Sequence, residues 1–94
     1  MAMMAIHPGE ALKLEMQARG LSANALALAL RVPSGRITDI LAGKRAVTPE
    51  TALRLGLYFA TGPELWLNLQ TAFDLSKAQK ALGAKIAGEV KPAA

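Results

Sequence analysis

The sequence contains no cysteine, which excludes a disulfide framework and a metal site built on thiolates. A chain without cysteine suits a reducing compartment, and we expect a cytoplasmic protein. Aromatic residues are scarce as well, with one tryptophan, one tyrosine and two phenylalanines. No apolar run reaches the roughly 18 residues of a membrane-spanning helix, and the first residues show no charged-then-apolar signal pattern. The sequence therefore predicts neither a membrane protein nor a secreted one.

Side chains that could carry catalysis are few and scattered. The single histidine, His7, has no partner at a suitable spacing, so we expect it to cap or pack rather than to react or bind metal. The seven carboxylates form no convincing acid–base pair. The stretch from Gly35 to Lys44 lacks the spacing of a phosphate-binding nucleotide loop, and Arg45 follows the lysine where Ser or Thr is needed. We predict no enzyme, no cofactor and no metal site.

The residues that are abundant favour helix. Hydrophobic residues make up 52% of the 94 residues, enough for one modest core but not for two. With so few aromatics, this core must consist mainly of Leu, Ala, Ile and Val, and richness in Ala and Leu favours helix over strand. We expect one all-α domain.

Start and stop signals divide the chain into about five helices, because proline fits a first helical turn and glycine often ends a helix. The expected helices run from Pro8 to about Arg19, from Ser22 to Leu30, from Pro33 to Ala42, from Pro49 onward, and from Pro63 through Leu75 to Leu82. After Gly83 we expect a frayed tail. Residues 1–76 then form the domain with its dimerising last helix, and residues 77–94 form a helical extension with a flexible, lysine-bearing tail.

The second and third helices are joined by a turn too short to let them separate. In the third helix Ile37, Ile40 and Leu41 share one face, which predicts that this face is buried. The opposite face carries Gly35, Asp39 and Ala42, flanked by Arg36 and Thr38. A helix of this kind can lie in a DNA major groove, so we predict a helix-turn-helix motif.

The candidate DNA contacts come from three places: the start of the second helix, the outer face of the third, and the basic segment behind it. They are Ser22, Asn24, Ser34, Gly35, Arg36, Thr38, Asp39, Lys44 and Arg45. Arg36 can pair bidentately with guanine, and Asp39 can accept from a cytosine amine or orient Arg36. The alternative for each is a plain solvated side chain, and for Ser22 a helix cap alone.

Charge is concentrated around the proposed motif. Between Arg31 and Arg54 five cations face two carboxylates, and from Ser76 onward four lysines face one glutamate. Surfaces need charges in any case, but this clustering favours a polyanionic partner.

One helix-turn-helix reads only a short half-site, so we expect a homodimer on double-stranded operator DNA. Trp66, Leu69 and Phe73 recur at helical spacing and are candidates for the dimer interface. Trp66 is the only tryptophan, and a core role is the default alternative for it.

These residues carry a resemblance to a known family. Leu26-Ala27, Leu30, Val32 and Ile37, followed by Gly43-Lys44-Arg45, resemble the helix-turn-helix of XRE regulators, which are lambda-repressor-like. The segments His7–Glu10, Thr48–Leu55 and Pro63–Gln70 extend this likeness to HigA-type antitoxins over about residues 6–76. Two positions depart from the pattern: Ala23 replaces a DNA-contacting Gln, and Arg31 replaces the Gly of the turn.

The resemblance implies an all-helical compact bundle and a homodimer on a palindromic operator. It also implies a toxin partner, a HigB-like mRNA interferase, and repression of the shared operon at the nucleoid. Two alternatives stay open, a stand-alone phage-type repressor without a toxin and a protein-binding antitoxin whose DNA contacts have decayed.

Overall fold

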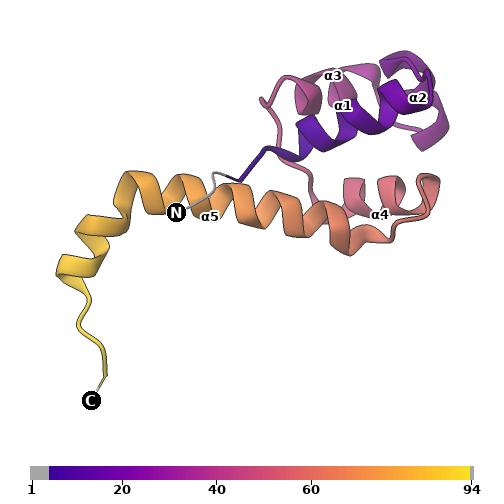
Figure 1. Cartoon of the computed structure of the whole chain (residues 1–94). Coiled ribbons are helices and arrows are strands. Elements are labelled where there is room, and N and C mark those ends of the chain that lie inside the picture. The colour runs from indigo at the N-terminus through magenta and orange to yellow at the C-terminus, as the bar shows by residue number, and fades with distance from the viewer. Residues whose placement is uncertain (1–4, 94) are drawn as a thin grey trace.

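The computed structural model describes residues 5–93, and these residues form five helices without a strand. The helices are α1 (Pro8–Ala18), α2 (Ala23–Leu30), α3 (Ser34–Leu41), α4 (Pro49–Tyr58) and α5 (Pro63–Glu89). Helices α1, α2 and α3 lie together on one side of α4 and of the first half of α5 (Figure 1). The expected all-α fold is confirmed. The first three helices begin and end within one residue of the expected positions, and α4 begins at the expected Pro49.

Side-chain caps explain why three of the helices begin where they do. The Ser22 hydroxyl accepts a hydrogen bond from the Ala25 N–H at 3.1 Å, and Thr48 accepts one from Thr51 at 3.4 Å. At α1 the cap is His7, whose Nδ1 accepts from the Gly9 N–H at 2.9 Å. The structural role predicted for this histidine is therefore confirmed.

The turn between α2 and α3 needs a left-handed residue, and the chain places Arg31 there with φ 58° and ψ 48°. Its N–H and that of Val32 bond back to carbonyls of the last turn of α2. A side chain in this conformation costs about 1–2 kcal/mol relative to glycine, so the turn that holds the motif is strained.

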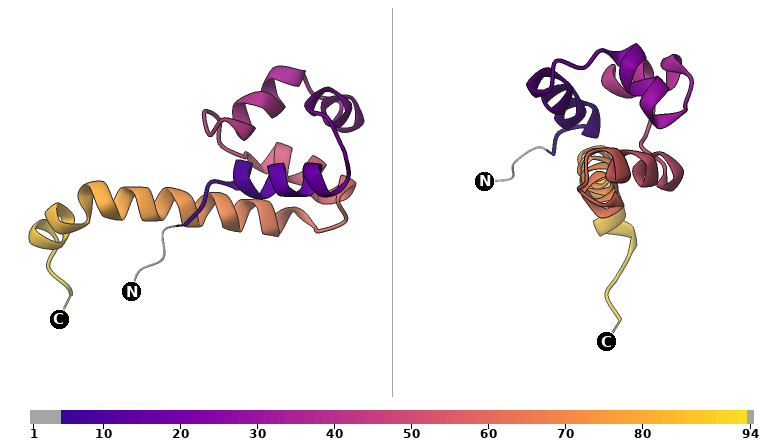
Figure 2. Two further views of the ribbon diagram at one scale, coloured as in Figure 1. Left: turned by 45° about the horizontal axis from the view of Figure 1, so that its top comes forward. Right: turned by 90° about the vertical axis from the view of Figure 1, so that its right-hand side faces the viewer.

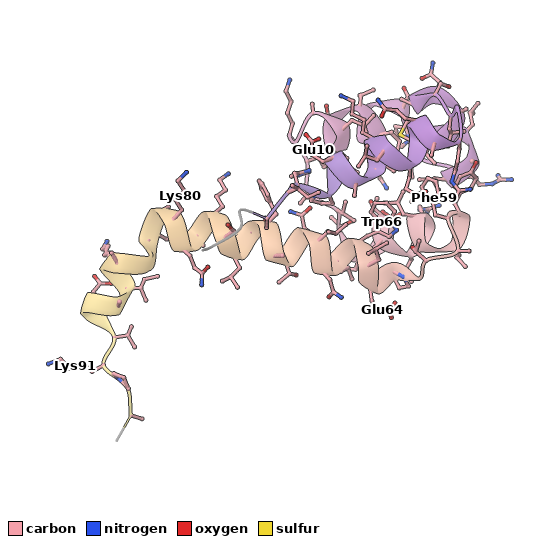
Figure 3. The ribbon with its side chains drawn as sticks, viewed as in Figure 1. Glu10, Phe59, Glu64, Trp66, Lys80 and Lys91 are labelled. Atoms are coloured by element: carbon pink, nitrogen blue, oxygen red, sulfur yellow. The ribbon has the colours of Figure 1, made fainter. Side chains whose placement is uncertain are left out.

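The core lies where α1, α2 and α3 meet α4 and α5. Its buried apolar residues are Leu12, Met16, Leu26, Ala27, Leu30, Ile37, Ile40, Val47, Ala52, Leu55, Phe59 and Trp66. Trp66 is 1% exposed and donates its indole N–H to the Thr61 hydroxyl at 3.0 Å. It points from α5 toward the layer of α1–α3, with Phe59 close by (Figure 3).

The dimer role predicted for Trp66 is therefore wrong, and the default core role is right. A side chain that is fully covered inside its own subunit has no surface left for a second one. Leu69 and Phe73 differ, because both keep part of their surface exposed. Phe73 packs edge-on against the His7 ring, with 4.9 Å between the centroids.

The last helix is longer than the sequence pattern predicts. It continues through Gly83 and Gly88 to Glu89, so the helix does not fray directly after Gly83 as expected. A glycine inside a helix costs only about 1 kcal/mol, and the neighbouring Ala, Leu and Lys residues favour helix. The second half of α5 extends away from the other helices, which gives the molecule extents of 52 × 24 × 21 Å (Figure 2). No helix within residues 5–93 combines the length and the apolar character needed to cross a bilayer.

Candidate nucleic-acid interface

The buried face of α3 is the one that the periodicity predicts. Ile37 and Ile40 are fully buried, whereas Gly35 and Thr38 on the outer side are exposed. No atom lies within 4 Å of the position that a Cβ on Gly35 would occupy. The outer face of α3 is thus open to solvent at Gly35 and Thr38, and the opposite face packs into the core through Ile37 and Ile40.

The N-termini of α2 and α3 open on the same shallow hollow. Asn24 from α2 and Ser34 from α3 line it, together with Leu28 and Val32. Ser22 stands at the start of α2, where its hydroxyl is engaged as the cap. Because the first N–H groups of a helix are unsatisfied and point outward, this region suits a phosphate oxygen.

Arg36 does not stand free on this surface. Its Nη1 donates a hydrogen bond to Glu50 Oε1 at 2.9 Å, and only 24% of its side chain is exposed. The suggestion that Asp39 orients Arg36 is wrong, because Asp39 instead faces Arg45, with 4.0 Å between Oδ2 and Nε. The sequence pattern missed Glu50 because it stands on another helix, 14 residues away.

Glu50 is itself held from its other side. Its Oε2 accepts from Arg54 Nη2 at 3.1 Å, and Arg54 Nη1 donates to the carbonyl of Leu30 at 2.8 Å. The hydrogen bond from Arg54, with the charge of Arg36, lowers the pKa of the Glu50 carboxyl below its ordinary value. A chain of contacts therefore runs from the end of α2 through α4 to the side chain of Arg36.

The basic segment behind α3 is exposed at Lys44 and Arg45 and is anchored just after them. The Val47 N–H donates to Oε1 of buried Gln70 at 2.8 Å, and Gln70 Nε2 donates to Asp74 at 3.0 Å. Gln70 was not among the predicted site residues. A polar residue at a helical core position is the signal that could have identified it.

Gly9 is a second position whose importance the sequence did not reveal. A Cβ built on Gly9 would lie 2.1 Å from the carbonyl oxygen of Ile40, near the end of α3. The start of α1 therefore touches the backbone of α3 directly, which only glycine permits. Within residues 5–93, no three His, Cys, Asp or Glu side chains gather as a metal would require.

A helix with an exposed outer face that follows another helix after a tight turn is the arrangement of a helix-turn-helix domain. The family model described as "Helix-turn-helix" matches residues 12–67. Virulence-associated protein I of Dichelobacter nodosus is 51% identical over 79 residues, which cover 83% of this chain and 73% of that protein. Among the solved structures that are similar over nearly the whole chain are two of HigA antitoxins.

The first is an addiction module antidote protein of the HigA family from Coxiella burnetii, 50% identical with a TM-score of 0.93, covering 97% of this chain and all of that one. The second is the Pseudomonas aeruginosa antitoxin HigA with the higBA promoter, 38% identical with a TM-score of 0.92, covering 96% and 99% of the two chains. The chain belongs to the HigA family of helix-turn-helix antitoxins, and the predicted resemblance is confirmed.

Proposed function

We propose that this protein binds its own promoter as a homodimer, represses a toxin–antitoxin operon and neutralises the toxin encoded there. The supporting observation is the exposed outer face of α3, with cations beside it, in a fold that resembles a HigA antitoxin solved with promoter DNA. Binding to operator DNA places the protein at the nucleoid in the cytoplasm.

In this proposal the outer face of α3 enters the major groove. Gly35 allows close approach, Thr38 reaches a base edge or a phosphate, and Arg36 pairs with a guanine. Phosphates are contacted by Lys44, Arg45 and the start of α2. Base contacts are few, so DNA shape shares in the specificity.

The test is a gel-shift series on the promoter upstream of the gene and on random DNA of equal length. Replacing Arg36 with alanine should weaken operator binding by about 1–3 kcal/mol and reduce the difference between the affinities for operator and for random DNA. The control is Lys77→Ala, since Lys77 is an exposed cation on the outer half of α5. The proposal fails if the wild-type protein does not distinguish promoter from random DNA.

Dimerisation has its own measurement. Leu69 and Phe73 remain the proposed dimer residues, because part of each is still exposed on α5. Light scattering of the protein with a palindromic operator should give two subunits per duplex. One subunit per duplex at saturation would contradict the homodimer.

Toxin neutralisation is tested separately, by co-expression with the adjacent reading frame. We expect a stable complex with a HigB-like mRNA interferase and loss of its ability to degrade mRNA. If the neighbour neither binds nor arrests growth while promoter binding is intact, the protein is a stand-alone repressor of the phage type.

A further inference from the structure

Arg36 and Glu50 form the one ion pair, within residues 5–93, that links α3 to another helix. The pair is short, and most of the Arg36 side chain is covered. The guanidinium group is planar, so fixing one N–H donor also fixes the directions of the others. Glu50 takes only Nη1, which leaves the remaining donors of Arg36 available to an acceptor outside the protein.

Glu50 is well placed to act as a fixed support. It stands in the first turn of α4, and Arg54 holds its second oxygen from one turn further along the same helix. Arg54 is tied in turn to the Leu30 carbonyl at the end of α2. The carboxylate is therefore linked to both helices of the motif, to α3 through Arg36 and to the end of α2 through Arg54.

An unpaired arginine on this surface would bind phosphates of any sequence, because backbone attraction does not depend on the bases. A carboxylate beside it has two effects. It offsets the attraction of Arg36 for phosphates, and it restricts the side chain to the few orientations that keep the ion pair. Both effects weaken binding to random DNA more than binding to a site that offers a guanine at the right place.

We infer that Glu50 is a positioning residue for DNA recognition, which raises the preference for operator over random DNA by holding Arg36. This inference rests on the proposed function, since it assigns Glu50 a role within promoter binding. Glu50 itself contacts no base. It acts through Arg36, and its own position is secured by Arg54.

The experiment measures binding to promoter and to random DNA for Glu50→Gln and for the matched control Glu64→Gln. Both glutamates follow the proline that opens a helix, and both are exposed, so each substitution removes the same charge from the same helical position. Glu64 lies on the side of α5 away from α3 (Figure 3). Glu50→Gln should lower the promoter-to-random ratio about 3–10-fold, mainly by tightening random binding, whereas Glu64→Gln should leave the ratio unchanged.

A double-mutant cycle separates positioning from a structural role. In an Arg36→Ala background the effect of Glu50→Gln on the ratio should fall below about twofold, because no arginine remains to be held. An equal effect of Glu50→Gln on the promoter-to-random ratio in both backgrounds overturns the inference. Glu50 would then act through its contact with Arg54 and not through Arg36. Equal ratios for wild type, Glu50→Gln and Glu64→Gln, with wild-type promoter binding intact, also overturn it. A wild-type protein that shows no preference for the promoter refutes the proposed function itself.

Discussion

Replacing Gly9 with alanine tests whether the start of α1 sets the position of α3. The added Cβ would lie 2.1 Å from the oxygen and 3.0 Å from the carbon of the Ile40 carbonyl. Both atoms belong to the backbone, so no side-chain rotation can make room. Either α1 or the end of α3 must move.

The expected cost follows from two opposing terms. Forcing an extra methyl into a packed site costs about 1–3 kcal/mol, and contact with rigid backbone puts Gly9 at the upper end of that range. Alanine regains at most about 1 kcal/mol through its better helix propensity. The net loss is about 2 kcal/mol, which for a domain of this size lowers Tm by roughly 8–16 °C.

Gly35→Ala is the matched control, because it is the same chemical change in a helix with no atom within 4 Å of the new methyl. It should raise the free energy of unfolding by up to about 1 kcal/mol. Thermal unfolding followed by circular dichroism measures both variants. If Gly9→Ala has a Tm equal to or above that of the wild type, the close contact between the start of α1 and the end of α3 does not set the position of α3.

Three further predictions concern the supports of the site. Arg31→Gly should stabilise the protein by about 0.5–1 kcal/mol in denaturant unfolding, because glycine adopts the left-handed conformation without strain. A lower free energy of unfolding would mean that the contacts of the Arg31 side chain stabilise the protein by more than the strain costs. Gln70→Leu should destabilise by about 1–3 kcal/mol by leaving the buried Val47 N–H unpaired, and an unchanged Tm would refute that role. The pKa of Glu50 is lowered in the folded state, so its stabilisation is full above its ordinary value of 4.5 and is lost as pH falls through the lowered value. The difference in Tm between wild type and Glu50→Gln should therefore shrink as the pH falls below 4.5. A difference that grows over this range would mean that folding raises the pKa of Glu50 instead of lowering it.

Local signals were enough to predict the order of the helices. Thr48 with Pro49 gives both a cap and a first-turn proline, and these signals act over three or four residues. They failed at Gly83, where the sequence suggested a stop. A glycine ends a helix reliably only when its left-handed conformation is used, as at Gly20 and Gly43 with φ of 60° and 74°. Gly83 stays helical, and nothing local distinguishes the two cases.

The site was predictable in outline for a similar reason. Helical periodicity fixes which residues of α3 face outward, so the exposure of Gly35 and Thr38 followed from the spacing of two isoleucines. The hydrogen-bond partner of Arg36 could not be predicted in the same way. Arg36 pairs with Glu50 rather than Asp39, because the approach of α4 to α3 decides which carboxylate is near. Such contacts depend on how helices pack, which no short-range pattern encodes.

The Gly9→Ala variant makes it possible to separate the effect of unfolding on operator affinity from the effect of a displaced α3. A domain of this kind is stable by at least about 5 kcal/mol, so a loss of about 2 kcal/mol in Gly9→Ala leaves all but about 1% of the molecules folded at 25 °C. Unfolding alone then lowers operator affinity by a negligible factor. A loss of several-fold or more in the gel shift at that temperature must come from α3 displaced at its Ile40 end. The same reasoning applied to Gly35→Ala, which gains stability, assigns any loss of its operator affinity to the methyl group on the outer face.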